Sequence, residues 1–145
     1  MSELKSILLA EDNPLDAELI LSALIDSRLA NQVIHVKDGV EALEYLRSEG
    51  KYLHRRVGHP AVVVLDIKMP RMDGIDTLRA IRSDPALKLI PVVMLTSSRE
   101  EQDLIRSYEL GSNAYVVKPL RFGDFVEAVK QLGVFWAILN EQPPR

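Results

Sequence analysis

The chain contains no cysteine, and this absence excludes disulfide bonds, thiolate catalysis and zinc sites built from cysteine. No apolar stretch is long enough to span a membrane, and the first residues are typical of neither a signal peptide nor a transit peptide. The formal net charge is -3, and the sequence has neither a basic run nor a helix-turn-helix segment. We therefore expect a cytoplasmic protein that binds neither nucleic acid nor a membrane.

The length and composition are those of one globular domain. With 145 residues, of which 47% are hydrophobic and 27% charged, the chain is long enough to bury a real core. We expect a single domain over residues 1–145, with its core at about 5–132 and an extended C-terminal helix to about residue 140. The tail at 141–145 is expected to fray.

Strand and helix patterns alternate five times along the chain. Short apolar runs rich in β-branched residues, typical of strands buried on both faces of a parallel sheet, lie at 7–10, 32–36, 61–65, 91–95 and 114–117. The segments between them and after the last have helical spacing of apolar residues. This alternation predicts an α/β fold with a doubly wound, five-stranded parallel sheet and five helices on its two faces.

Residue chemistry marks the ends of the predicted helices. Asn13 and Pro14 suit the start of the first helix, which we expect to run to about residue 29. Asp38 with Glu41 predicts a capping box for the second helix, and Gly50 is expected to stop it. The later helices are expected at about 74–84, 98–111 and 120–140.

Polar residues follow four of the predicted strands at the point where each strand ends. Glu11 and Asp12 follow the first strand, Asp66 the third, Thr96 the fourth and Lys118 the fifth. In open α/β sheets the ligand crevice lies outside the carboxyl ends of the strands. These segments would therefore bring three carboxylates, a hydroxyl and an ammonium to one place, a grouping that suits a divalent cation and a phosphoryl group.

Each of these residues also has a purely structural interpretation. Glu11 and Asp12 suit the positive end of a helix dipole, Asp66 and Thr96 suit strand-end turns, and Lys118 suits a solvated surface. Three carboxylates in one crevice would repel one another unless a cation is present. Asp66 could act as the nucleophile of phosphoryl transfer, because this reaction requires mainly positioning and positive charge, which Mg²⁺ and Lys118 would supply.

The set resembles the receiver domain of two-component response regulators along essentially the whole chain. The matching residues are Glu11-Asp12, Asp66, Met69-Pro70, Asp73-Gly74, Thr96-Ser97, Tyr115 and Lys118-Pro119. The resemblance implies the flavodoxin-like strand order 2-1-3-4-5. It also implies that Asp66 accepts a phosphoryl group from a sensor histidine kinase.

The resemblance further implies a role for each residue of the crevice. Asp12 and Asp66 would hold Mg²⁺ directly, Glu11 would support it through water, and the backbone carbonyl of Lys68 would complete the protein ligands. Thr96 and Lys118 would contact the phosphoryl oxygens, and Tyr115 would be the switch aromatic.

Two features resemble the small single-domain regulators that partner phytochrome-type histidine kinases. One is the long polar loop over 51–60, whose histidines, His54 and His59, we expect to be solvated. The other is the extended last helix, where Phe135 and Trp136 continue one apolar face. We expect these two aromatic side chains to form a homodimer interface or a surface that docks the kinase.

Taken together, these features predict a stand-alone phosphorylatable switch in a phosphorelay, without a fused output domain, which catalyses only its own phosphorylation and slow dephosphorylation. A chemotaxis-type receiver acting on a motor or another target protein is the alternative within the family. An aspartate-nucleophile phosphatase of the haloacid dehalogenase type is disfavoured, because Lys68 stands where its second acid would be. A flavodoxin-like nucleotide binder is disfavoured because Glu11 and Asp12 would repel phosphate.

Overall fold

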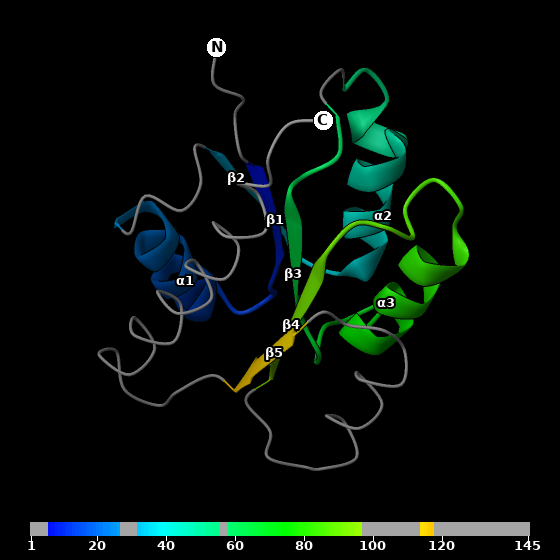
Figure 1. Ribbon diagram of the computed structural model, residues 1–145. Helices are drawn as coiled ribbons and strands as arrows, with labels where there is room; N and C mark the ends of the chain where they lie inside the picture. Colours follow the sequence, from blue (N-terminus) through cyan, green and yellow to red (C-terminus); the bar gives the residue numbers. More distant parts are fainter. Residues whose placement is uncertain (1–5, 27–31, 56–57, 97–113, 118–145) are drawn as a thin grey trace, which may run out of the picture.

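The computed structural model describes residues 6–26, 32–55, 58–96 and 114–117. Their strands form one parallel five-stranded sheet in the order β2-β1-β3-β4-β5, as expected (Figure 1). The strands are β1 (Ser6–Ala10), β2 (Gln32–Val36), β3 (Val62–Asp66), β4 (Val92–Thr96) and β5 (Ala114–Val117).

Helices cover both faces of this sheet. In Figure 1, α1 lies on one side of the strands, and α2 and α3 lie together on the other. Their bounds are α1 (Pro14–Asp26), α2 (Gly39–Arg47) and α3 (Gly74–Ser83), and a short 3₁₀ helix, η1 (Gly50–Tyr52), follows α2. The doubly wound fold is thus confirmed, whereas the two later helices expected from the sequence lie outside the described residues.

The side chains of each strand alternate between the two faces of the sheet. On one face, Leu8, Leu65 and Met94 are fully buried beneath α2 and α3 and belong to a cluster with Leu43 and Leu78 of these helices. The strands β1 and β3 are buried almost throughout, which agrees with their β-branched and aliphatic composition. This packing holds the carboxyl ends of the two central strands side by side.

Each of the three described α-helices begins at a side chain that accepts backbone N–H groups. Asn13 Oδ1 accepts from the N–H groups of Leu15 and Asp16 at 2.9 and 3.0 Å. Asp38 and Asp73 cap α2 and α3 in the same way, each accepting from the N–H three residues later. Asn13 and Asp38 lie three and two residues past the ends of β1 and β2, so these two caps also fix how the chain leaves the sheet.

One local expectation changes in the structure. Helix α2 ends at Arg47 rather than at Gly50, because Ser48 takes the left-handed conformation (φ 55°, ψ 51°) and its N–H bonds to Glu44 and Tyr45 carbonyls. On α1, Ala17 and Ile20 are buried, whereas Leu15 is 72% exposed.

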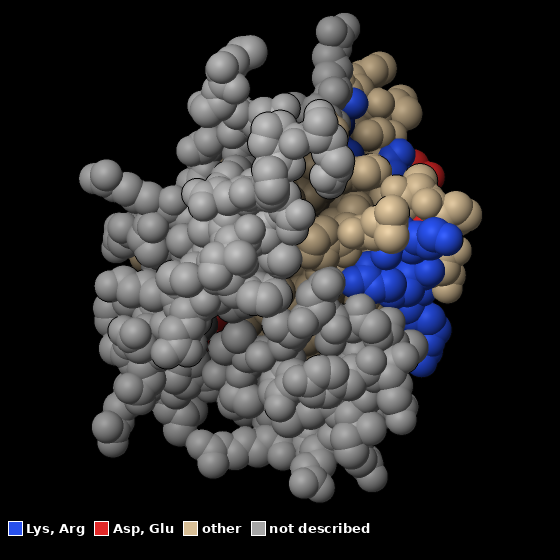
Figure 2. Space-filling model, viewed as in Figure 1, with Lys and Arg blue, Asp and Glu red and all other residues tan. Residues whose placement is uncertain are grey.

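Basic side chains gather over the α3 side of the described surface (Figure 2). Arg82 of this helix donates from Nη1 to the carbonyls of Lys88 and Ile90 at 3.0 and 2.9 Å, and Arg47 pairs with Asp84 at 3.2 Å. These contacts tie the end of α3 to neighbouring segments. Across the described residues, no helix combines the length and apolar character needed to cross a membrane.

Candidate functional site

Three carboxylates meet at the carboxyl edge of the sheet. Glu11 and Asp12 directly follow β1, and Asp66 is the last residue of β3, which pairs with β1. One oxygen atom of each carboxylate lies within 4.8 Å of the others. Glu11 is fully buried, Asp66 is 6% exposed and Asp12 is exposed, so the cluster has a buried floor and an open side.

Glu11 is held in place by the neighbouring edge strand. Its N–H donates to the carbonyl of Val36 at 3.0 Å, which continues the β1–β2 ladder one residue past the strand. Its carbonyl accepts a hydrogen bond of 2.8 Å from Nε2 of His35, so this imidazole nitrogen carries a proton. Sequence analysis gave His35 no role, although the register of β1 and β2 places it opposite Leu9, two residues before Glu11.

The loop after Asp66 is closed on itself. The N–H of Gly74 donates to the carbonyl of Ile67 at 2.8 Å, and the N–H of Ile67 donates to the Leu95 carbonyl at 3.0 Å. A Cβ atom on Gly74 would overlap the backbone carbonyl of Asp66, so only glycine allows the start of α3 to approach the end of β3 this closely. The loop over 67–73 therefore returns directly beside the acidic cluster.

A cleft of about 510 Å³ opens beside Asp12. Its other lining residues all come from the β3–α3 loop or the start of α3: Ile67, Lys68, Met69, Pro70, Asp73 and Ile75. Lys68 has an exposed side chain at this wall. A small phosphorylated molecule or a partner's side chain could reach the open side of the acidic cluster through this cleft.

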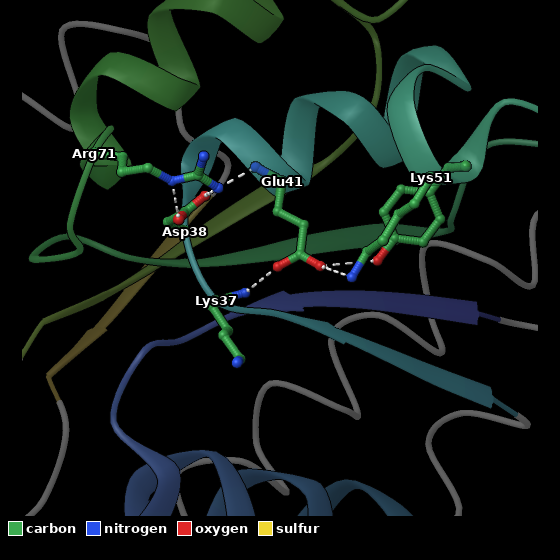
Figure 3. A network of polar contacts seen from close by, with 6 residues as sticks. Lys37, Asp38, Glu41, Lys51 and Arg71 are labelled. Atoms are coloured by element: carbon green, nitrogen blue, oxygen red, sulfur yellow. Dashed lines mark hydrogen bonds and ion pairs between the residues drawn. The ribbon is translucent and has the colours of Figure 1, made fainter.

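A network of polar contacts surrounds the start of α2, next to the cleft loop (Figure 3). Asp38 accepts from Glu41 N–H at 2.9 Å and from Nε and Nη2 of Arg71 at 2.8 and 3.1 Å. Glu41 in turn accepts from the Lys37 N–H, the Lys51 ammonium and the Tyr52 hydroxyl, at 3.0, 2.6 and 3.2 Å. The network thus joins the cleft loop, the first turn of α2 and η1.

These contacts lower the pKa values of both acids in the network, Asp38 and Glu41. Burial alone would raise the pKa of Asp38, but the hydrogen bonds from Arg71 and from the Glu41 N–H outweigh burial and lower its pKa. Burial likewise opposes ionisation of Glu41, and its bonds to Lys51 and to the Lys37 N–H lower its pKa. Both carboxylates are therefore anionic at neutral pH.

The remaining predicted site residues are placed only in part. Thr96 ends β4, where its strand neighbour Leu95 pairs with Asp66, and Tyr115 lies on β5 opposite Met94. Their side chains are outside the described set, as are Lys118, Phe135 and Trp136 entirely.

The donor set of the acidic cluster fits a hard divalent cation. Mg²⁺ and Mn²⁺ bind carboxylate oxygens, and they usually keep several waters, which the exposed side at Asp12 would admit. Placing three carboxylates this close without a cation is unfavourable, because like charges raise one another's energy. The residues present therefore fit the ion that the sequence analysis expects.

The response regulator receiver domain model matches residues 7–130 of the chain. This chain belongs to the response regulator receiver domain family. The fold, strand order and clustered acids described above are thus those of a receiver domain in two-component signalling. Membership in this family favours neither a haloacid-dehalogenase-type phosphatase nor a flavodoxin-like nucleotide binder.

Individual relatives support this assignment. The response regulator Rcp1 of Synechocystis sp. is 37% identical over 132 residues, which cover 91% of this chain and 88% of that protein. A structure of Rcp1 in its Mn²⁺-bound form, 36% identical, has a TM-score of 0.86 and covers 97% of this chain and 99% of the other.

Two further solved structures are described as phytochrome response regulators. The bacteriophytochrome response regulator AtBRR is 58% identical, with a TM-score of 0.78 and coverage of 97% of this chain and 100% of that one. The phosphorylated cyanobacterial phytochrome response regulator RcpA is 39% identical, with a TM-score of 0.88, and the match covers 98% of this chain and 100% of that one.

Proposed function

We propose that Asp66 accepts a phosphoryl group from the phosphohistidine of a sensor histidine kinase. The observation that carries this proposal is the convergence of Glu11, Asp12 and Asp66 at the carboxyl edge of a receiver-domain sheet. An oxygen of the Asp66 carboxylate attacks phosphorus, the bond from phosphorus to the histidine nitrogen breaks, and that nitrogen keeps the electron pair. The other ring nitrogen of the phosphohistidine carries a proton and keeps it, so the products are an aspartyl-phosphate and a neutral imidazole.

Asp12 and Asp66 would hold Mg²⁺, with Glu11 acting through water and the Lys68 carbonyl completing the protein ligands. A bound Mg²⁺ supplies the positive charge that a phosphoryl group needs as it moves between two nucleophiles. The Mn²⁺-bound form of Rcp1 supports a divalent ion in this family. The cleft beside Asp12 supplies the route by which the phosphodonor approaches.

Thr96, Lys118 and Tyr115 complete the proposed switch. Thr96 and Lys118 would contact the phosphoryl oxygens, and Tyr115 would respond when Thr96 moves. Thr96 ends β4, Lys118 follows β5 in the sequence and Tyr115 lies within β5. These positions support the arrangement, since β4 and β5 follow β3 in the sheet. The chain would then be a signalling switch, catalysing only its own phosphorylation and slow dephosphorylation.

The experiment that tests the nucleophile is labelling by acetyl phosphate, read by intact mass. With Mg²⁺ the wild type should gain one phosphoryl group that is lost in base, and chelator should prevent the gain. Asp66→Asn should gain none. Asp76→Asn is the matched control, because Asp76 is an exposed acid of α3 paired with Arg79 and should not change labelling. Equal labelling of Asp66→Asn and wild type would overturn the assignment.

We also propose a phytochrome-type histidine kinase as the partner. AtBRR and RcpA, both similar along nearly the whole chain, are described as phytochrome response regulators, which supports this choice over a chemotaxis kinase. A purified bacteriophytochrome kinase, once phosphorylated, should transfer its phosphoryl group to this chain faster than a chemotaxis kinase does. The reverse preference would favour the chemotaxis-type alternative.

The single domain over residues 1–145 and the dimer through Phe135 and Trp136 are also proposals. Nearly complete mutual coverage with AtBRR supports the single domain. Sedimentation of the wild type against a Phe135→Ala/Trp136→Ala double variant would test the dimer. A monomeric wild type at tens of micromolar, phosphorylated or not, would remove it.

A further inference from the structure

The loop between β3 and α3 contains a strained turn. The N–H of Met72 donates to the carbonyl of Pro70 at 2.6 Å, and Arg71 between them has a φ of 62°. A three-residue turn closed in this way with a positive φ is the rarer and more strained form of the γ-turn. An arginine in this conformation persists only when its surroundings hold it there.

Two contacts from the start of α2 hold this turn. The N–H of Gly39 donates to the carbonyl of Met72 at 3.1 Å, and a Cβ on Gly39 would overlap side-chain and backbone atoms of Thr77 and Met72. The first residue of α2 therefore lies directly against the loop. The second contact is the bidentate pair of Arg71 with Asp38 at 2.8 and 3.1 Å, which points from the turn to the helix start (Figure 3).

Asp38 is a fixed anchor for Arg71. Its side chain is 7% exposed, and Oδ1 also accepts from the Glu41 N–H that it caps. The carboxylate cannot turn to follow a moving guanidinium without giving up the helix cap. Arg71 itself is 60% exposed, and an exposed ion pair contributes little to overall stability. The pair therefore restricts where the turn lies more than it stabilises the whole fold.

The restrained loop forms one wall of the cleft. Lys68 and Met69 immediately precede the turn and Pro70 is its first residue, and all three line the cleft together with Asp12. The loop is short and closed by the Gly74–Ile67 hydrogen bond, so a shift at the turn must displace this wall.

We propose that Arg71 is a positioning residue for the phosphorylation site, because by bonding Asp38 it holds the cleft wall that contains the Lys68 carbonyl. This role rests on the proposed function of Asp66. Arg71 would touch neither the phosphoryl group nor the metal, and it would act only through the loop.

Two variants break the pair while preserving the local fold. Arg71→Gly removes the guanidinium, and glycine accepts a positive φ without strain. Asp38→Asn removes the charge, and asparagine caps a helix as well as aspartate does. Arg79→Gln is the matched control, because it removes an arginine from the exposed 3.0 Å pair with Asp76 on α3. Arg71→Lys keeps the charge but cannot form the bidentate pair with Asp38. Its Mg²⁺ requirement for labelling should therefore lie between those of wild type and Arg71→Gly.

The first measurement is hydrogen exchange of residues 67–74 in the metal-free proteins. Exchange should be faster in Arg71→Gly and in Asp38→Asn than in wild type and Arg79→Gln. The second is the Mg²⁺ concentration that gives half-maximal labelling by acetyl phosphate. It should rise roughly tenfold in both variants, the lower end of the effect of losing an outer-shell partner of a metal site. The Arg71→Gly/Asp38→Asn double variant should be no worse than either single variant.

The outcomes separate this role from the proposed function. A wild type that gains no label at Asp66 contradicts the proposed function and removes the positioning role with it. A wild type that labels normally, beside variants with unchanged Mg²⁺ dependence, overturns the positioning role alone. Faster loop exchange without a change in Mg²⁺ dependence also overturns it, because the pair would then be merely structural.

Discussion

Two strand-to-helix connections bring acids to the same site, and they are held in different ways. Between β1 and α1 only residues 11–13 separate strand from helix. There, Glu11 is bonded by the edge strand through its N–H and its carbonyl, and Asn13 caps the helix at once. Between β3 and α3 the connection is longer, at 67–73, and it contains a turn with positive φ.

The difference shows that a longer connection requires more contacts with distant residues to hold its conformation. The short connection is fixed by two bonds between Glu11 and the neighbouring strand β2 and by the Asn13 cap of α1. The longer one requires a glycine at its end and a side-chain pair to a helix start about thirty residues earlier in the sequence. Acids at the short connection should therefore depend on the strand pairing, whereas the other cleft wall should depend on contacts that a single substitution can remove.

The largest effect is expected from Gly74→Ala at the end of the longer connection. Its Cβ would meet the backbone carbonyl of Asp66, which cannot move aside without disturbing β3. We expect the free energy of unfolding, measured in urea, to fall by about 3 kcal/mol, the upper end of the usual cost of overpacking. Gly58→Ala, where a Cβ meets nothing within 4 Å, should change it by less than about 0.5 kcal/mol. Equal losses in both variants would contradict the close approach.

Asp12→Asn tests the charge of the short connection. Without metal, removing one of three clustered carboxylates should raise the free energy of unfolding by about 1 kcal/mol, since the three negative charges repel one another. At a hundredfold excess over its Kd, Mg²⁺ should stabilise the wild type by about 2.7 kcal/mol and the variant by less. Equal stabilisation of both proteins by Mg²⁺ would show that the cluster is not the metal site.

The Asp38–Arg71 pair should make stability depend on pH. Since the fold lowers the pKa of Asp38 below its ordinary value of 3.8, the stabilisation is complete above that value and is lost as the pH falls through the folded-state pKa. The melting temperature of wild type should thus exceed that of Asp38→Asn at pH 7, and the gap should close below about pH 4. A gap that stays constant down to pH 2 would contradict this assignment.

The smallest effect is expected at His35. His35→Ala removes the donor to the Glu11 carbonyl, but the side chain is exposed and water can replace it. The free energy of unfolding, measured in urea, should fall by about 0.5 kcal/mol, which is the low end for a single hydrogen bond. His59→Ala, an exposed histidine of the 58–61 segment, is the control and should cause no change. A large loss for His35→Ala would mean that the short connection also depends on one side chain.

Much of this architecture is predictable because it is local. The strand segments follow from apolar runs, and the caps at Asn13 and Asp38 follow from residue type and spacing. The meeting of Glu11, Asp12 and Asp66 follows from one rule, that parallel strands end at one edge of the sheet. The exposure of His54 and His59 is confirmed for the same reason, since their loop lies at the other edge.

What sequence reasoning missed depends on contacts between distant segments. Nothing near Arg71 indicates that its partner is Asp38, because the two residues lie 33 positions apart in the sequence. Ser48 rather than Gly50 ends α2, since contacts of the following segment with the helix decide which residue turns left-handed. His35 gained a role only through the register between β1 and β2.

The most direct test is to locate the phosphoryl group among the acids of the cleft. After labelling with acetyl phosphate and Mg²⁺, borohydride reduces an aspartyl-phosphate to homoserine, which tandem mass spectrometry can place by residue. Three aspartates border the site: Asp12, Asp66 and Asp73. We expect homoserine at position 66 alone, because this carboxylate ends the central strand between its neighbours. Homoserine at position 12 or 73, with Asp66 intact, would contradict the assignment.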